Sequence, residues 1–241
     1  MHSFGTASTV RVKYVASERS YRIESADEKP QPWLRDENTA VMTRDAPILS
    51  AFDFDGTLTC KDSFVSFLLD SCGLPGLGAK LLTRPGLVAD YIRTGNRGAL
   101  KSRLLFALFG AISRADLDAL IAAFAARTGM TLFRPDALRA WRATSGLRVI
   151  VTASPECLVA RFGEMIGADR VIGTRLGFSA DGRLLPDLDG ANCRGEEKMR
   201  RLREVYGDDL DLVAAYGDTA GDREMIAAAR DGHYRVFHER P

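Results

Sequence analysis

Apolar and polar positions follow different patterns in successive parts of this chain. Residues 1–46 mix Ser, Thr, Glu, Arg and Pro, with one short alternating patch at Val10–Val15, so they predict a flexible extension with one short strand. From residue 47 the pattern becomes compact. The run Ile48–Phe54 is mostly apolar, has the length of a strand, and ends in the turn sequence Asp55-Gly56-Thr57.

Residues 61–145 have only helical spacing of their apolar positions. Asp62 or Ser63 can cap a first helix that runs to Cys72, after which three glycines and Pro75 interrupt the pattern. Ser113, followed three residues later by Asp116, is typical of a helix start. Four further helices are predicted, at Leu81–Arg93, Ala99–Phe109, Arg114–Arg127 and Pro135–Thr144.

Strands return at Leu147–Thr152, a β-branched run, and from there strands and helices alternate. Ser154-Pro155-Glu156 predicts the start of a helix that runs to Ile166. The later elements are predicted as a strand at 170–173, a hairpin around 180–182, a helix at 195–206, a strand at 211–216, a helix at 220–230 and a strand at 234–237.

This alternation implies a parallel sheet whose strands are joined by crossover helices. The predicted fold class is therefore α/β, a Rossmann-like parallel sheet core with an inserted all-helical domain. The predicted boundaries are 1–46 for the extension, 47–60 and 146–241 for the α/β core, and 61–145 for the helical insertion.

Composition excludes several classes of protein. The 33 Lys and Arg residues nearly balance the 32 Asp and Glu residues, so no global positive field is present to hold a nucleic acid. Charged residues and glycines break every apolar stretch before about 18 residues, so no transmembrane segment is expected. Four widely spaced cysteines and an amino terminus without a signal-type apolar region favour the cytoplasm. Nothing in the pattern indicates an oligomeric state.

Carboxylates dominate the candidate chemistry. Open α/β sheets bind ligands at the carboxyl ends of their strands, and four aspartates follow two predicted strands: Asp53, Asp55, Asp218 and Asp222. Such a group would raise the pKa of each member unless a cation lay between them. Oxygen ligands suit a hard ion such as Mg²⁺, which also binds substrate phosphate.

A phosphoryl group would find its remaining partners near the next strand end. Thr152 offers a hydroxyl there, and the amides of Ala153 and Ser154 lead into a helix whose amino terminus favours anions. Lys198 supplies a positive charge. A carboxylate not fully engaged by the metal can attack phosphorus, while a second carboxyl group protonates the leaving alcohol and later activates water.

These segments resemble the four motifs of the haloacid dehalogenase (HAD) superfamily. Asp53–Thr59 is similar to its DxDGTxT motif, Thr152 lies in the second motif, Lys198 is the third, and Gly217–Asp222 matches the GDxxxD form. The resemblance implies that Asp53 is the nucleophile and Asp55 the general acid/base. It also implies a Mg²⁺ site made by Asp53, the backbone carbonyl of Asp55, and Asp218, with Asp222 as a further ligand or in support. Thr152, Ala153 and Lys198 would hold the phosphoryl group of a small-molecule phosphate ester, and the insertion resembles the C1 cap that selects substrate.

Within the superfamily, the segment Asn192–Lys198 and the sequence Thr-Ala-Ser-Pro resemble the subfamily IB hydrolases related to phosphoserine phosphatase. Asp62 stands where those enzymes carry a substrate-binding Glu, and Arg103 resembles their carboxylate-binding Arg; a helix cap and a surface residue are the alternatives. The shorter acid and the lack of a Gly-Gly pair after Thr152 argue against phosphoserine itself.

Three other activities are alternatives to a small-molecule phosphatase. A phosphatidylglycerophosphate-type lipid phosphatase shares the overall plan, and a phosphotransferase would use the same aspartyl-phosphate. A dehalogenase needs neither a second acid nor a metal, so Asp55 and Asp218 argue against that activity.

Overall fold

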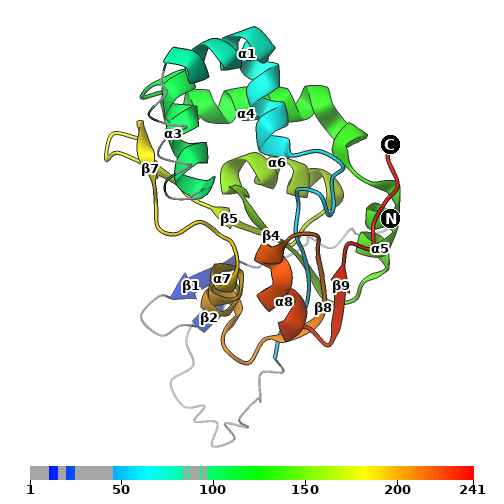
Figure 1. The fold of residues 1–241 in the computed structure, drawn as a ribbon. Helices are drawn as coiled ribbons and strands as arrows, with labels where there is room; N and C mark the ends of the chain where they lie inside the picture. Colours follow the sequence, from blue (N-terminus) through cyan, green and yellow to red (C-terminus); the bar gives the residue numbers. More distant parts are fainter. Residues whose placement is uncertain (1–10, 16–19, 25–45, 84–85, 87–92, 94–96) are drawn as a thin grey trace, which may run out of the picture. The chain divides into compact units, whose positions relative to one another are not determined.

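The computed structural model describes residues 11–15, 20–24, 46–83, 86, 93 and 97–241, with the fold shown in Figure 1. The chain divides into two compact units, Met1–Arg44 and Asp45–Pro241. In the first unit, β1 (Arg11–Val15) and β2 (Ser20–Glu24) pair antiparallel, so a second strand joins the one predicted there. The rest of the predicted extension, and most of the predicted helix at 81–93, lie outside the described residues.

The second unit is built on a five-stranded parallel sheet, in the order β5-β4-β3-β8-β9. Its strands are β3 (Ile48–Phe52), β4 (Leu147–Pro155), β5 (Arg170–Thr174), β8 (Asp211–Gly217) and β9 (Asp231–Tyr234). β3 lies at the centre, between β4 and β8. This arrangement, with helices between successive strands, confirms the predicted fold class.

Side chains alternate between the two faces of the sheet, as the pleat of a strand requires. On β4, Val149 and Val151 belong to one buried cluster, whereas Ile150 belongs to the other. Helices α7 (Glu196–Tyr206) and α8 (Arg223–Ala228) cover the first face through residues such as Leu202 and Met225. Helices therefore lie on both sides of the sheet, which explains why its strands read as nearly continuous apolar runs.

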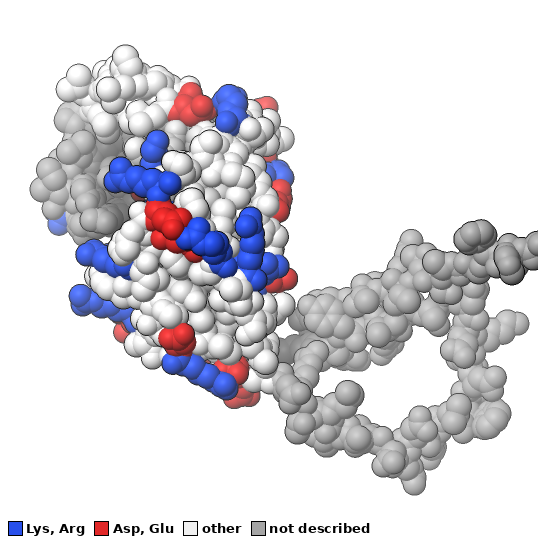
Figure 2. Space-filling model, turned by 90° about the vertical axis from the view of Figure 1, so that its right-hand side faces the viewer, with Lys and Arg blue, Asp and Glu red and all other residues white. Residues whose placement is uncertain are grey.

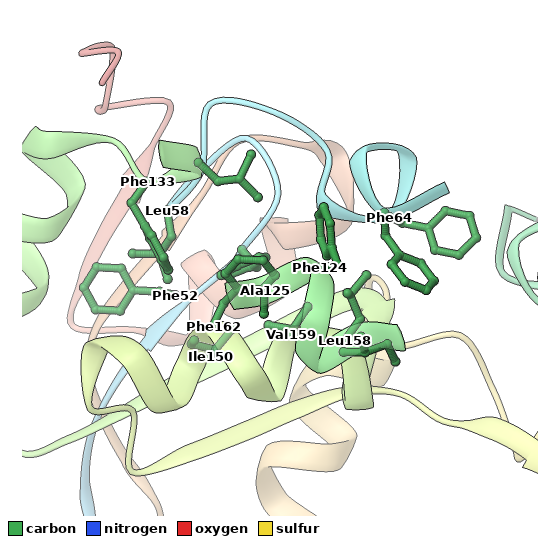
Figure 3. Close-up of a cluster of buried hydrophobic side chains, with 14 of the residues drawn as sticks. Phe52, Leu58, Phe64, Phe124, Ala125, Phe133, Ile150, Leu158, Val159 and Phe162 are labelled. Carbon is green, nitrogen blue, oxygen red and sulfur yellow. The ribbon is translucent and has the colours of Figure 1, made fainter. Parts of the chain in front are cut away.

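The opposite face is covered by α5 (Pro135–Ala143) and α6 (Glu156–Ile166). Figure 3 shows the aromatic part of this core, in which Phe162 of α6 lies 5.8 Å from both Phe54 and Phe124 between ring centroids. Trp141 of α5 packs edge-on against Phe52 of the sheet. The predicted boundary at 145 assigns α5 to the helical insertion, but this helix packs on the sheet.

Three longer helices of the insertion between β3 and β4 lie above the sheet in Figure 1: α1 (Ser63–Thr83), α3 (Arg97–Phe109) and α4 (Arg114–Thr128). The short 3-10 helix η1 (Gly129–Leu132) follows α4. Ser113 caps α4 as predicted, because its hydroxyl accepts the amide hydrogen of Asp116. The predicted break after Cys72 is also present, since Gly73 has non-helical angles (φ 66°, ψ 170°) that kink α1.

α1 is the one described helix long and apolar enough to cross a membrane, judged by length and composition alone. Leu74 and Leu82 are 74% and 84% exposed. Only 11% of its apolar window is buried, although Phe64, Phe67 and Leu68 of its first half lie in the core.

Two elements near the carboxyl terminus differ from the predicted ones. The helix predicted at 220–230 is a 3-10 turn, η2 (Ala220–Asp222), followed by the short α8. The last strand is β9 rather than residues 234–237. It lies earlier because Gly232 passes close to the end of α8, where a Cβ would meet the Ile226 carbonyl oxygen at 2.6 Å. Arg235, with φ 56°, then turns the chain out of the strand direction.

The predicted hairpin around 180–182 is confirmed as β6 (Leu176–Phe178) and β7 (Leu184–Leu188), which pair antiparallel. On the face of the molecule shown in Figure 2, positive and negative side chains lie close to one another without a broad area of one sign. This mixture agrees with the net charge of +1.

Candidate active site

The candidate site lies where three adjacent strands end. β3 leads directly into Asp53, whose amide donates to the Tyr216 carbonyl oxygen of β8 at 2.8 Å. β4 carries Thr152, and β8 ends just before Asp218. Because β3 lies between β4 and β8 and all three run parallel, motifs separated by up to 165 residues meet at one edge of the sheet.

Lys198 is the electrostatic centre of the site. Its side chain is 1% exposed, and its ammonium group lies 2.6 Å from Asp53 Oδ1 and 2.7 Å from Asp222 Oδ1. A third proton is donated to the Val151 carbonyl oxygen. All three ammonium hydrogens are therefore used within the protein, so Lys198 acts on a bound anion as a fixed positive charge.

These buried charges shift one another's pKa values. Burial raises the pKa of Asp53 to about 7, and the charge of Asp222 adds to this shift although Lys198 opposes it. Burial alone would lower the pKa of Lys198, but the attraction of Asp53 and Asp222 outweighs burial and holds that pKa above its usual range. Asp222 keeps a lowered pKa because Lys198 and the donors of Thr219 outweigh its burial.

Three carboxylates form a cluster suited to a cation. Asp53, Asp218 and Asp222 each offer an oxygen, and these oxygens lie within 4.8 Å of one another. An all-oxygen donor set fits a hard divalent ion such as Mg²⁺. Among the described residues, Asp53 Oδ2 and Asp218 Oδ1 share one side-chain partner, Thr57 Oγ1, at the long distance of 3.4 Å. Their lone pairs therefore stay available to a metal.

Asp222 is engaged differently from the other two acids. Its Oδ2 accepts hydrogens from the amide of Asp218 and from the amide and hydroxyl of Thr219, while its Oδ1 faces Lys198. With both oxygens occupied, Asp222 is better placed to orient the loop that carries Asp218 than to give a free ligand atom.

Gly56 makes the close approach of the first and fourth motifs possible. It has φ +90°, and a Cβ at this position would lie 2.3 Å from Asp218 Oδ2. Any other residue would be strained and would displace that carboxylate. Gly56 in the turn Asp55-Gly56-Thr57 thus leaves the space in which Asp218 lies beside Asp53.

Asp55 is held by the helical insertion as well as by the sheet. Its Oδ1 accepts the amide hydrogen of Ser63, the first residue of α1, at 2.7 Å, and its Oδ2 accepts the hydroxyl hydrogen of Ser154. Burial raises its pKa and the charge of Asp62 adds to this effect, although Lys101 and the two hydrogen bonds oppose it. A carboxyl group with a raised pKa can keep a proton to donate.

Thr152 and Ala153 lie in the wall of a cavity of about 140 Å³ beside these acids. Thr152 is 1% exposed, and its Oγ1 accepts the amide hydrogen of Ser154 at 3.1 Å, which leaves its own hydroxyl hydrogen for another acceptor. The Ala153 carbonyl oxygen is bound by the Thr174 hydroxyl. The cavity is also lined by Asp53, Asp55, Asp62, Gly98, Lys101, Asn192, Arg194, Lys198, Thr219, Gly221 and Asp222.

The two substrate residues expected in the insertion are placed differently. Asp62 lines the cavity, and its Oδ1 accepts the Val65 amide hydrogen at 2.9 Å and caps α1, so the helix-cap alternative is present while a substrate contact stays a prediction. Arg103 is outside the cavity lining, and its guanidinium lies 3.9 Å from Asp187 of β7. On α3 it is Lys101 that lines the cavity, together with Gly98 three residues earlier.

Sequence reasoning missed Lys101, Asn192 and Arg194 as cavity residues. Residues three apart share a helix face, whereas Arg103 is turned by about 200° from Lys101 around α3. The three-residue spacing of Gly98 and Lys101 could thus have predicted that they share the helix face toward the cavity. Asn192 and Arg194 come from the loop before α7, where no periodicity fixes which side chains point into a site.

A comparison with protein families matches residues 51–227 to the haloacid dehalogenase-like hydrolases. The chain belongs to this family. The match covers all four motifs and the helical insertion, so the family resemblance predicted from the motifs is confirmed, and with it the prediction of a hydrolase of this family.

The chain is also similar to individual proteins. Protein CicA from Caulobacter vibrioides is 48% identical over 198 residues, which cover 81% of this chain and 89% of that protein. A protein of unknown function from Bordetella pertussis has a similar structure (TM-score 0.61, 23% identity, 76% of this chain and 87% of that one). A phosphoserine phosphohydrolase-like protein from Francisella tularensis shares the fold at a TM-score of 0.52 and 15% identity, over 78% and 85% of the two chains.

Proposed function

We propose that this HAD-family protein is a Mg²⁺-dependent phosphomonoester hydrolase of the subfamily IB type that acts through an aspartyl-phosphate on Asp53. The observation that carries the proposal is the unequal engagement of the Asp53 carboxylate. Its Oδ1 is bound by Lys198 at 2.6 Å, whereas the one side-chain partner of Oδ2 within the described residues is the Thr57 hydroxyl at 3.4 Å. Oδ2 is therefore an oriented and available nucleophile.

The first half-reaction would transfer the phosphoryl group to Asp53. Oδ2 attacks phosphorus, the bond from phosphorus to the ester oxygen breaks, and Asp55 gives its proton to the leaving alcohol. The Thr152 hydroxyl would hold a phosphoryl oxygen while Lys198 balances the negative charge. Mg²⁺, held by Asp53, Asp218 and the Asp55 carbonyl oxygen, would neutralise phosphoryl charge and fix its orientation.

The second half-reaction would use Asp55 as a base. Asp55 takes a proton from water, the water oxygen attacks phosphorus, and the bond to Asp53 Oδ2 breaks to release inorganic phosphate. Asp55 is fixed from two sides, by the Ser63 amide and the Ser154 hydroxyl. Transfer to an acceptor alcohol in place of water would follow the same steps and would make the protein a phosphotransferase.

A panel assay tests the proposal directly. Phosphate release should be measured from phosphoserine, sugar phosphates, nucleotides and three-carbon phosphate esters, with Mg²⁺ and with a chelator. We expect release from at least one small ester that stops when the chelator is added. Release of halide from a haloacid without metal, and no phosphate from any ester, would reject the proposal.

A lipid phosphatase is the second candidate, because one structural observation favours it. The exposed leucines of α1 would suit contact with a membrane surface. A lysophospholipid phosphate presented in vesicles belongs in the same panel. Faster release from it than from every soluble ester would place the substrate in the membrane.

Metal binding should depend on pH in a predictable direction. Because burial raises the pKa of Asp53 to about 7 from an ordinary 3.8, ionisation of this group costs stability in the metal-free protein as pH rises from about 4 to 7. Mg²⁺ relieves that cost only where Asp53 is ionised. The increase in melting temperature on adding Mg²⁺ should therefore be larger at pH 8 than at pH 5, and smaller in Asp218→Asn. An equal increase at both values would contradict the assigned site.

Docking of α3 on the core should be needed for turnover. A Cβ at Gly98 would lie 2.7 Å from the Asn192 Cβ, closer than side-chain atoms pack, so Gly98→Ala should push α3 away from the cavity. We expect kcat/KM to fall about tenfold and the melting temperature to fall as well, because the clash with Asn192 outweighs the better helix propensity of Ala. Gly78→Ala, where a Cβ meets nothing within 4 Å, is the matched control. Unchanged kcat/KM in Gly98→Ala would show that this contact is not used.

A further inference from the structure

Lys101 brings a positive charge from the helical insertion to the leaving-group side of the cavity. Its ammonium group donates to Ser154 Oγ at 3.0 Å and lies 5.3 Å from the centre of the Phe64 ring. The same Ser154 hydroxyl donates to Asp55 Oδ2. One hydroxyl group thus separates Lys101 from the acid that would protonate the leaving oxygen, so we expect the leaving group to lie near this ammonium.

Arg194 brings a second positive charge from the core. It lines the same cavity, and its side chain lies over Gly221, where a Cβ would meet the Arg194 Cγ at 2.6 Å. The absence of a side chain at 221 is therefore what leaves room for this arginine beside Thr219 and Asp222. Asn192, two residues before Arg194 along the chain, lies against Gly98 of the insertion.

The three cations in the cavity wall differ in how far they are already neutralised. Lys198 is matched by Asp53 and Asp222 at 2.6 and 2.7 Å. In the described part of the chain, no carboxylate lies within 4.0 Å of the charged nitrogens of Lys101 or Arg194. Two acids of the cavity lining are partly engaged elsewhere, since Asp55 is bound by Ser63 and Ser154 and Asp62 caps α1.

We infer that Lys101 and Arg194 form a subsite for a second anionic group of the substrate, next to the phosphate that is cleaved. The inference rests on the proposed phosphomonoesterase activity and narrows its substrate class. The substrate is then a compact phosphate ester whose leaving alcohol carries a carboxylate or a second phosphate. The enclosed part of the cavity, about 140 Å³, has room for a leaving group of a few carbon atoms.

The subsite also connects substrate charge to the docking of the insertion. Lys101 belongs to α3 and Arg194 to the loop before α7, so one anion bound by both would join the two parts of the chain across the cavity. A neutral alcohol of equal size would give no such link. Selectivity for the second anion should therefore appear in binding as well as in turnover.

The test compares 3-phosphoglycerate with glycerol 3-phosphate, which differ in a carboxylate against a hydroxymethyl group. Binding is measured by calorimetry on Asp53→Asn with Mg²⁺, and turnover on the protein with Asp53 intact. We expect 3-phosphoglycerate to bind Asp53→Asn about tenfold more tightly, and to give an about tenfold higher kcat/KM with the intact protein. One or two charge-assisted hydrogen bonds would give a difference of this size. Propane-1,3-diyl bisphosphate shows whether a second phosphate is accepted in place of the carboxylate.

Lys101→Met and Arg194→Met should each remove most of this preference. Lys101→Met also removes the hydrogen bond to Ser154, so the kcat of this variant is expected to fall for both esters. The ratio of kcat/KM for 3-phosphoglycerate to that for glycerol 3-phosphate therefore reports on the subsite alone. Lys80→Met and Arg203→Met, at exposed positions outside the cavity lining, are the matched controls and should keep the preference.

The possible outcomes separate the two proposals. Binding preference without phosphate release would keep the subsite and reject the hydrolase. If phosphate is released and both esters bind with equal affinity, the subsite is rejected and the hydrolase is kept. The same holds if the Lys101 and Arg194 variants lower affinity and kcat/KM equally for the two esters. Failure of all of these esters to bind and to be hydrolysed would overturn the subsite.

Discussion

Asp53→Asn should reduce phosphate release by about 10⁴-fold or more, because a carboxamide cannot replace the attacking carboxylate oxygen. The folded structure should survive. Asparagine has nearly the same shape, and its carbonyl oxygen can still accept a hydrogen from Lys198, as Asp53 Oδ1 does at 2.6 Å. Since burial raises the pKa of Asp53 to about 7, removal of its charge should leave the melting temperature at pH 8 unchanged or higher.

The measurement combines phosphate release with thermal unfolding at pH 8. Asp209→Asn, at an exposed position outside the four motifs and the cavity lining, controls for the loss of one negative charge. More than a tenth of the original kcat in Asp53→Asn would exclude this residue as the nucleophile. The mass of the protein with Asp53 intact, trapped during turnover, should show a phosphoryl group that the variant never acquires.

Lys198→Met should damage stability as well as turnover. The substitution removes the common partner of Asp53 and Asp222 and leaves two buried carboxylates without a countercharge. Breaking a buried ion pair in this way costs about 3–5 kcal/mol of unfolding free energy. The cost should be larger at pH 8 than at pH 5, because an uncompensated buried carboxyl group is stable only while it is protonated.

Denaturant unfolding at the two pH values measures this effect, with Lys80→Met at an exposed site as the control. Adding Asp222→Asn to Lys198→Met should restore part of the lost stability, since one of the two stranded charges disappears. An unfolding free energy close to that of the unsubstituted protein in Lys198→Met would show that Lys198 does not hold the acids together.

Much of the core could be predicted from the sequence because its signals are local. The apolar run before Asp53, the β-branched run before Thr152 and the run before Asp218 each define a strand, and the order of the motifs predicts that their ends meet. The structure brings these residues together around Lys198. Local signals also located the Ser113 cap and the break in α1 at Gly73.

The features that could not be predicted depend on contacts between distant segments. Gly232 of β9 passes close to the end of α8, and Val236 and Phe237 beyond the end of β9 gave a misleading strand signal. α5 looks like part of the insertion along the chain, yet Trp141 fixes it to the sheet. The choice of Lys101 over Arg103 depended on the rotation of α3 about its axis, which motif position does not specify.

The order of strands in the sheet has a consequence for synthesis of the protein. The central strand, β3, is made early, but its two neighbours begin about 100 and 160 residues later, at Leu147 and Asp211. During translation the emerging β3 must therefore stay unpaired, with an apolar segment exposed, until β4 has left the ribosome, and its other edge stays open until β8 follows. Because Asp218 follows β8, the cluster of acids that could hold a metal is also completed late in synthesis. An incomplete chain would thus be an aggregation-prone species without a metal site, rather than a partly active enzyme.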